Sequence, residues 1–301
     1  MFSSERAPAL SYALVTVSVP PADARRAGEI QWPASLPGDP RRDFVTLQAD
    51  FLDKQAFNAG IATVAKATGR SQVLVFVHGF NNRFDESVYR LVQIVEDSRA
   101  PVIPVLFSWP SRGIVGVRTY QQDRDSASQS SEPLNQVLDM LARNPNVTDV
   151  TVLCHSMGCL PTLDALQSRS LRVGKIGAKI RNILLVAPDV DFNVFQEQTQ
   201  HMGSLRPRFA LFLSQDDRAL RIAQSISGGA TRLGNVNPDE EPYSSFFEHE
   251  GIFVSDMTHL QGNAHSRAFS EITSVTGMIE RRLAAGQQMA EILPETDDGA
   301  Q

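Results

Sequence analysis

The sequence predicts a protein of the α/β class, in which a mostly parallel sheet is covered by helices on both faces. Two observations indicate this class. Apolar runs of strand length alternate with helical patterns from about residue 53 onward, and most of these runs are apolar at consecutive positions. Strands that are apolar on both faces are typical of a parallel sheet buried between two layers of helices.

The N-terminal part predicts a different local arrangement. Two β-like runs, 12–19 and 44–48, flank a connection rich in proline and glycine. This pattern predicts an antiparallel pair at the N-terminal edge of the sheet. From residue 53 on, the expected helices cover 53–69, 84–98, 130–144, 157–170 and 266–283, and the expected strands cover 72–79, 102–110, 150–156, 179–189, 208–217 and 251–256. Further helical candidates follow the runs at 179–189 and 208–217.

Two long stretches interrupt this alternation. Residues 111–128 are polar with glycines at the start, and 228–250 are longer still, so we expect loops that line a site or are disordered. Phe246 and Phe247 either wall a pocket or anchor the second of these loops. With no internal repeat and no large insertion, the sequence predicts one domain over residues 1–286 and a disordered polar tail over 287–301.

Composition excludes several classes of function. The net charge is −6, from 28 basic and 34 acidic residues, and no basic cluster is present, which argues against binding to nucleic acid. No apolar stretch is long enough for a membrane span. The N-terminus lacks the basic start and apolar block of a signal peptide, so a cytoplasmic protein is expected, with a trimmed secreted or periplasmic form as the alternative. The oligomeric state is left open.

The chain contains two cysteines, Cys154 and Cys159. Cys154 is expected to end a strand and Cys159 to lie in the following helix. A disulfide between them would require the intervening turn to bend. We therefore expect two small, buried, unbonded residues.

Ser156 lies where the apolar run VTVLCHS stops and a helical pattern begins. In a strand–turn–helix arrangement of the G-x-S-x-G type, the hydroxyl is held out of the sheet at a helix N-terminus, which favours developing negative charge. The positions two before and two after the serine must be small. Gly158 meets this requirement, and Cys154 is larger than glycine but still small. The pattern predicts that Ser156 is a nucleophile.

A second motif, VFVHGFNN (75–82), is an apolar strand that ends in a polar loop. In acyl-transfer hydrolases of this architecture, the loop after the equivalent strand supplies one N–H of the oxyanion hole, and the residue after the nucleophile supplies the other. These donors are expected to be the backbone N–H groups of Phe80 and Met157. We interpret His78 as a structural residue that shapes the loop, because a catalytic base belongs later in the chain.

The ordered set of motifs resembles a known family. The chain contains, in this order, VFVHGFNN, LFSWPS (106–111), Tyr120, Asp123, LCHSMG, VAPDVD and SQDDRAL. Together these are similar to the bacterial α/β-hydrolase group catalogued as domain of unknown function 900, whose members are often described as esterase- or lipase-like. The resemblance covers residues 28–269 and implies an α/β-hydrolase fold. Cys154 stands where that family usually has alanine or glycine, and NAHSRAF lacks the tyrosine expected after the histidine.

This fold implies a triad in the chain order serine, acid, histidine. For the acid, the RFALFLSQDD run offers Asp216 and Asp217. The family's S-x-x-D-x-A-L pattern aligns with Asp217, which is therefore the expected acid, and Asp216 is an alternative. Asp189 and Asp191, which follow the preceding strand, are interpreted as residues that shape a loop or cap a helix, and either one is an alternative acid.

For the histidine, His259 and His265 both follow the last strand, and His265 matches the family's His-Ser. His265 is therefore the expected base and His259 the alternative. We expect His155 to pack beneath the turn, while His201 and His249 lie in loops that need not reach the site.

These residues together predict a serine hydrolase that cleaves carboxylic esters through an acyl-enzyme intermediate. The histidines and cysteines lack zinc-site spacing, and there is no glycine-rich phosphate loop, so no metal or organic cofactor is expected. Only about 20 residues separate the VAPD and RFALFL motifs, too few for a large lid domain, which favours small to medium ester substrates. The alternatives are a thioesterase, lactonase or amidase with the same triad, and a non-catalytic protein that binds a ligand or partner in the same cleft.

Overall fold

A computed structural model describes residues 2–260, 262–265 and 269 of the chain. Six parallel strands form the central sheet in the order β4-β3-β5-β6-β7-β8. These strands are β3 (Gln72–Val77), β4 (Val102–Phe107), β5 (Asp149–His155), β6 (Ile180–Val186), β7 (Arg208–Leu213) and β8 (Phe253–Asp256). The predicted parallel sheet is confirmed, and each of its strands begins within two residues of the expected position.

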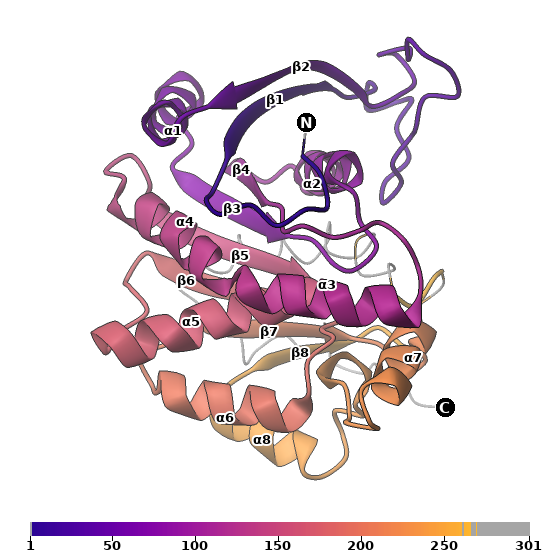
Figure 1. Cartoon of the computed structure of the whole chain (residues 1–301), viewed down its shortest axis with the longest axis vertical. Helices are drawn as coiled ribbons and strands as arrows, with labels where there is room; N and C mark the ends of the chain where they lie inside the picture. Colours follow the sequence, from indigo (N-terminus) through magenta and orange to yellow (C-terminus); the bar gives the residue numbers. More distant parts are fainter. Residues whose placement is uncertain (1, 261, 266–268, 270–301) are drawn as a thin grey trace, which may run out of the picture.

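The predicted antiparallel pair is also present. β1 (Tyr12–Ser18) pairs with β2 (Val45–Leu52), and the two form a separate two-stranded sheet. In Figure 1 this pair arches over one edge of the molecule, next to α1. Phe44 lies just before β2 and packs with Val88 and Tyr89 of α2, which ties the small sheet to the main body.

Helices cover both faces of the central sheet, as the sequence predicts. The α-helices are α1 (Lys54–Thr68), α2 (Phe84–Ser98), α3 (Val117–Gln129), α4 (Ser131–Arg143), α5 (Cys159–Val173), α6 (Phe192–Met202), α7 (Arg218–Ile226) and α8 (Tyr243–Glu250). Two 3₁₀ turns, η1 (Ser156–Gly158) and η2 (Leu233–Asn235), complete the described elements. Figure 1 shows α3, α4, α5 and α6 crossing in front of the sheet.

The two faces of the sheet belong to different core clusters. Val73, Val75 and Val77 of β3 pack with apolar residues of α1, α4 and α5, while the alternate residues Leu74 and Phe76 pack with α2. Successive side chains of a strand point to opposite faces, so a strand that is buried on both sides is apolar at every position. This is the physical basis of the continuous apolar runs.

Two stretches that were expected to be long loops contain helices instead. Within 111–128, α3 buries Tyr120, Asp123, Ser126 and Ala127. Its inward face carries a carboxylate and a hydroxyl, so the apolar periodicity that identifies a helix is missing from the sequence.

In the second stretch, α8 buries Phe246 and Phe247 against Phe192 and Phe195 of α6. The two phenylalanines therefore anchor the segment in the core. The expected final helix, 266–283, and the polar tail, 287–301, lie outside the described residues apart from Phe269.

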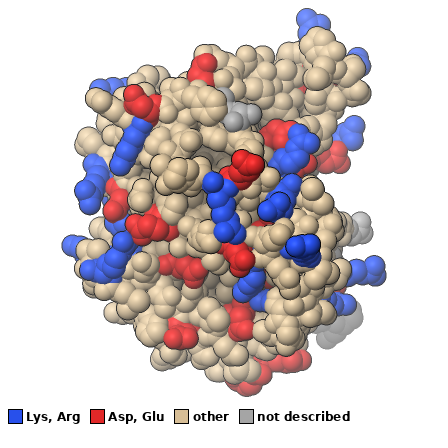
Figure 2. Space-filling model, in the orientation of Figure 1, with Lys and Arg blue, Asp and Glu red and all other residues tan. Residues whose placement is uncertain are grey.

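Acidic and basic side chains are intermixed on the face of the molecule shown in Figure 2, with no broad area of a single sign among the described residues. None of the helices in the described part of the chain has the length and hydrophobicity of a membrane span.

Candidate active site

Ser156 occupies the turn between β5 and α5. β5 ends at His155, η1 covers the next three residues, and α5 begins at Cys159. Ser156 has φ of +51° and is 4 % exposed. A positive φ is uncommon for residues other than glycine and is found mainly where the surrounding structure imposes it, often at functional sites. The backbone therefore turns sharply at Ser156.

Gly158 is required by a close approach of two backbones. A Cβ atom at this position would lie 2.2 Å from the carbonyl oxygen of His78 and 2.6 Å from that of Val77. The start of α5 thus lies directly against the end of β3, and a side chain at position 158 would force backbone atoms apart. Cys154 is different, because its side chain points toward Cys159.

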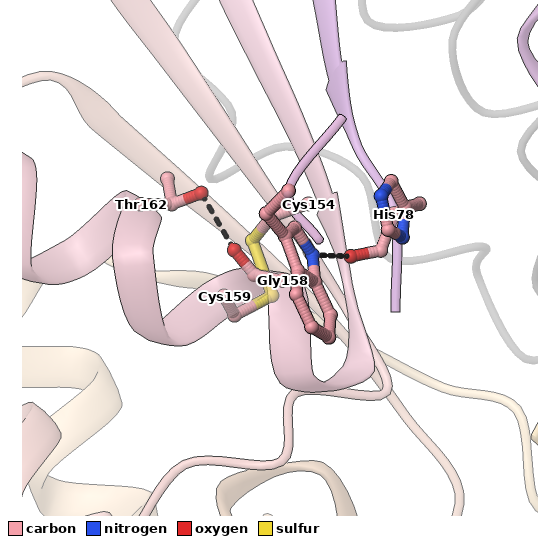
Figure 3. Close-up of a disulfide and its surroundings, with 6 residues drawn as sticks. His78, Cys154, Gly158, Cys159 and Thr162 are labelled. Atoms are coloured by element: carbon pink, nitrogen blue, oxygen red, sulfur yellow. Dashed lines mark hydrogen bonds between the residues drawn. A yellow bond between two sulfur atoms is a disulfide. The ribbon is translucent and has the colours of Figure 1, made fainter. Parts of the chain in front are cut away.

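The structure forms a disulfide between Cys154 and Cys159, with their Cα atoms 5.0 Å apart. The expectation of two unbonded cysteines was therefore wrong. The turn brings the end of β5 and the first residue of α5 within bonding range, which a straight passage from strand to helix would not do. Figure 3 shows this bridge beside the bond that Thr162 donates to the Gly158 carbonyl.

Asp217 and His265 come together from separate loops. The Oδ2 atom of Asp217 lies 2.7 Å from Nδ1 of His265, and the carboxylate is fully buried. Oδ1 of Asp217 accepts hydrogen bonds from the backbone N–H groups of Ala219 and Leu220 at the start of α7. Since the carboxylate only accepts, Nδ1 of His265 carries the proton and Nε2 is left as an acceptor.

His155 links the Ser156 turn to the loop that carries His265. Nε2 of His155 lies 3.1 Å from the carbonyl oxygen of His265, and the centroids of the two rings are 4.8 Å apart. Because a carbonyl can only accept, His155 donates this bond. Burial, followed by the nearby His265, lowers the pKa of His155 well below its usual value. A direct hydrogen bond between Ser156 and His265 is not formed within the described part of the chain.

The loop after β3 passes over Ser156. A Cβ atom on Gly79 would lie 3.0 Å from Cβ of Ser156. Asn82 holds this loop by donating from Nδ2 to the carbonyl of Phe80 at 2.8 Å and more weakly to that of Gly79. The N–H of Phe80 donates to no acceptor among residues 2–260 and 262–265.

His78 supports this loop from below. Its ring stacks on Trp109 with centroids 4.9 Å apart, and its nitrogens lie 3.0 Å from the Gly79 carbonyl and 3.2 Å from the Ser108 hydroxyl. Trp109 also donates from Nε1 to the His78 carbonyl, the second dashed line in Figure 3. Burial lowers the pKa of His78 to about 4, so the ring is neutral at pH 7. These contacts agree with a structural role for His78.

Asp189 belongs to a buried polar cluster that the sequence did not reveal. It accepts a hydrogen bond of 2.7 Å from the Tyr120 hydroxyl and lies 3.3 Å from Nε of Arg232, which is 1 % exposed. Burial, followed by the charge of Asp189, raises the pKa of Tyr120 to about 12. The backbone N–H of Asp189 donates to the carbonyl of Ser156, so the cluster directly adjoins the turn.

A cavity of about 380 Å³ opens beside this cluster, lined in part by Tyr120, Arg124, Val194 and Arg232. Tyr120 also packs edge-on against Phe80, at 5.6 Å between ring centroids. Tyr120 therefore contacts both the cavity and the loop after β3, while the described residues that line the cavity include none from the Ser156 turn or from the loop of His265. A tyrosine 69 positions before its aspartate carries no local sequence signal, which is why pattern analysis missed this contact.

The remaining sequence candidates are placed elsewhere. Asp191 caps α6 by accepting from Asn193 and Val194, as a helix-capping residue does. His259 is exposed on the loop after β8, and His249 is exposed at the end of α8. Asp123 accepts from the Ser111 hydroxyl and the Arg112 N–H, and so fastens the segment before α3 to that helix.

The chain matches a known protein family. The model of the family described as "Alpha/beta hydrolase of unknown function (DUF900)" matches residues 53–282. No significant match was found among curated proteins.

Similar solved structures include the esterase Pf2001 of Pyrococcus furiosus, with 12% identity, a TM-score of 0.44 and coverage of 71% of this chain and 84% of that one. Another is Est1E from Butyrivibrio proteoclasticus, with 11% identity, a TM-score of 0.41 and coverage of 72% and 89%.

Proposed function

Because the chain belongs to the family of alpha/beta hydrolases of unknown function (DUF900), whose model spans residues 53–282, we propose that it is a serine hydrolase that cleaves carboxylic esters. The observation that carries the proposal is the 2.7 Å contact between Asp217 and His265, in loops that follow parallel strands of the sheet that also presents Ser156. A carboxylate, an imidazole and a hydroxyl in this chain order form the catalytic unit of serine hydrolases.

In the proposed mechanism, Ser156 attacks the acyl carbon while Nε2 of His265 accepts the hydroxyl proton. The bond to the alcohol then breaks, and the proton passes from His265 to the departing oxygen. Water attacks the acyl-enzyme with His265 again acting as the base. Catalytic hydrogen bonds often tighten only when substrate binds, so the bond between Ser156 and His265 is expected to form in the complex with substrate.

Asp217 is proposed to orient His265 and to stabilise its protonated form. One oxygen of the carboxylate is held by two backbone N–H groups of α7, which leaves the other aimed at the imidazole. A group fixed in this way needs no reorganisation when charge develops on the ring.

The backbone N–H groups of Phe80 and Met157 are proposed to bind the oxyanion. The support for Phe80 is that its loop lies against Ser156 and that its N–H has no acceptor in the described part of the chain. Met157 is the residue after the nucleophile, at the start of the turn that leads into α5, where free N–H groups favour negative charge.

Small to medium esters are the proposed substrates. Between β6 and β7 the chain forms only α6 and short connections, so this segment contributes no lid domain over the site. We expect kcat/KM to be highest for short and medium acyl chains in a series of p-nitrophenyl esters, and to exceed that for matched thioester, lactone and amide substrates.

The proposal is tested by intact-mass analysis after incubation with a fluorophosphonate. We expect one adduct on the wild-type protein, none on Ser156→Ala, and labelling slower on the order of 10⁴-fold or more for His265→Ala. His259→Ala is the matched control, because His259 lies exposed on the same loop, and it is expected to label like the wild type.

Other outcomes point to specific alternatives. Absence of an adduct on the wild-type protein would contradict the hydrolase proposal and favour a non-catalytic ligand-binding protein. Labelling that is lost in His259→Ala but kept in His265→Ala would move the base to His259.

A further inference from the structure

The disulfide between Cys154 and Cys159 encloses the proposed nucleophile. Cys154 is the next-to-last residue of β5, and Cys159 is the first residue of α5. Between them lie only His155, Ser156, Met157 and Gly158. The bridge therefore closes a small ring that contains Ser156 and one of the two proposed oxyanion donors.

The surroundings of this ring leave it little freedom. Both sulfur-bearing residues are fully buried, in the same apolar cluster as Trp109 and Met157. No side chain fits between Gly158 and the end of β3, since a Cβ atom at position 158 would overlap the carbonyl oxygens of Val77 and His78. The Gly158 carbonyl is in turn bound by the Thr162 hydroxyl at 2.9 Å, which ties it to the first turn of α5. Figure 3 shows the bridge beside Gly158 and Thr162.

Breaking the bond must displace atoms in this packed region. A disulfide holds its sulfur atoms at about 2.05 Å, whereas unbonded heavy atoms are most favourably separated by about 3.5–4.0 Å. The two thiols therefore need roughly 1.5 Å of additional separation. Protein interiors have few voids that could absorb such a movement. Because the ring lies close against the end of β3 at Gly158, a displacement of its ends also moves Ser156 and Met157 within it.

We propose that the Cys154–Cys159 disulfide is a positioning element of the active site, which holds Ser156 and the Met157 N–H in the geometry for acylation. The inference rests on the proposed serine hydrolase function. A misplacement of about 1 Å at a reacting group can lower a rate on the order of 100-fold. Activity therefore depends on the oxidation state of this pair.

The reductant for this change is a dithiol. Its thiolate attacks one sulfur of the bridge and forms a mixed disulfide, and its second thiol displaces that bond. The products are two cysteine thiols and the cyclic disulfide of the reductant, so two electrons and two protons pass to the protein. Reoxidation by an excess of the oxidised reductant reverses the reaction.

The test compares two forms of the full chain, both refolded from urea, one with and one without dithiothreitol. Thiol trapping followed by intact mass establishes the oxidation state of each form. We expect the second-order rate constant of fluorophosphonate labelling to be about 10- to 100-fold lower in the reduced form, with similar far-UV circular dichroism. For p-nitrophenyl acetate, kcat is expected to fall with little change in KM, and reoxidation is expected to restore the rate.

The double variant Cys154→Ala, Cys159→Ala is the matched control, because the chain has no other cysteine. Its labelling rate is expected to be the same with and without dithiothreitol. If dithiothreitol slows this variant as well, the reductant acts elsewhere and the inference is wrong.

The remaining outcomes are also decisive. Equal labelling rates of the oxidised and reduced forms would overturn the inference and leave the proposed function intact. Two free thiols in the untreated protein would have the same consequence. If the reduced chain does not refold, the variant Cys159→Ser is used, because it has an unbonded pair of nearly the same volume. Fluorophosphonate is expected to label this variant slowly. Labelling of Cys159→Ser at the wild-type rate would overturn the inference. No adduct on any form would instead overturn the proposed function.

Discussion

At the scale of single residues, His78 shows how burial fixes a charge state near the site. Its ring is enclosed between Trp109 and the loop after β3, and burial lowers its pKa to about 4. The unfolded chain binds a proton at this residue below about pH 6.5, while the folded chain does so only near pH 4. The folded state is therefore stabilised by the neutral ring above pH 6.5, and this contribution is lost as the pH falls toward 4.

This linkage predicts a pH dependence of stability. Each pKa unit is equivalent to about 1.4 kcal/mol, so the contribution of His78 to the free energy of unfolding should fall by about 3 kcal/mol between pH 6.5 and pH 4. Urea denaturation of His78→Gln is expected to show a correspondingly smaller decrease over this range than the wild type. His249→Gln, at an exposed position, is the control and should keep the wild-type decrease. Parallel pH profiles for the wild type and His78→Gln would contradict a buried neutral His78.

At the scale of secondary-structure elements, one carboxylate at the start of α7 makes two kinds of contact. Oδ1 of Asp217 caps the helix and Oδ2 meets His265. Asparagine is also a good N-cap, but it lacks the charge, and its amide donor disfavours the required tautomer of the histidine. Substitutions at this position can therefore separate helix capping from the proposed orientation of His265.

We expect Asp217→Asn to change the free energy of unfolding by less than about 1 kcal/mol, and to slow fluorophosphonate labelling on the order of 10⁴-fold. Asp217→Ala should lose about a further 1 kcal/mol of stability. Asp53→Ala removes the equivalent cap of α1, far from the site in the chain, and should lose a similar stability with normal labelling. Wild-type labelling by Asp217→Asn would transfer the acid role to Asp189, Asp191 or Asp216.

At the scale of the whole molecule, the cluster of Tyr120, Asp189 and Arg232 joins α3, the segment after β6 and the segment after α7. The buried ion pair between Asp189 and Arg232 fixes these segments around the cavity. Removing one partner of such a pair leaves a buried charge without compensation, which is far more costly than losing an exposed pair.

Arg232→Met is expected to lower the free energy of unfolding by about 3–5 kcal/mol, measured by urea denaturation. The double variant Arg232→Met, Asp189→Asn should recover part of this loss, because no charge is left unpaired. Arg26→Met breaks an exposed pair with Glu29 and should cost less than about 1 kcal/mol. A loss for Arg232→Met as small as that for Arg26→Met would show that the buried pair does not stabilise the fold.

Whether an element of the fold could be predicted from the sequence depends on how far apart in the chain the residues that form its contacts lie. The boundaries of α2 agree with its sequence pattern because Val88, Leu91 and Val95 recur at helical spacing on its buried side. α3 escaped prediction because its buried face includes Asp123 and Ser126, whose partners lie outside the helix or in its own backbone. Local periodicity identifies buried apolar side chains, but it does not identify polar side chains that are buried by contacts with distant parts of the chain.

Local sequence patterns alone predict the alternation of strands and helices, a turn at Ser156 and the short set of acids and bases that follow it. These depend on apolar periodicity, turn chemistry and chain order, which are local properties. The tertiary structure decided that Asp217 meets His265 across 48 positions, that Tyr120 reaches Asp189 across 69, and that Cys154 bonds to Cys159. Such contacts depend on how the ends of parallel strands converge at one edge of the sheet, and on the angle at which a helix leaves a strand, which no single segment encodes.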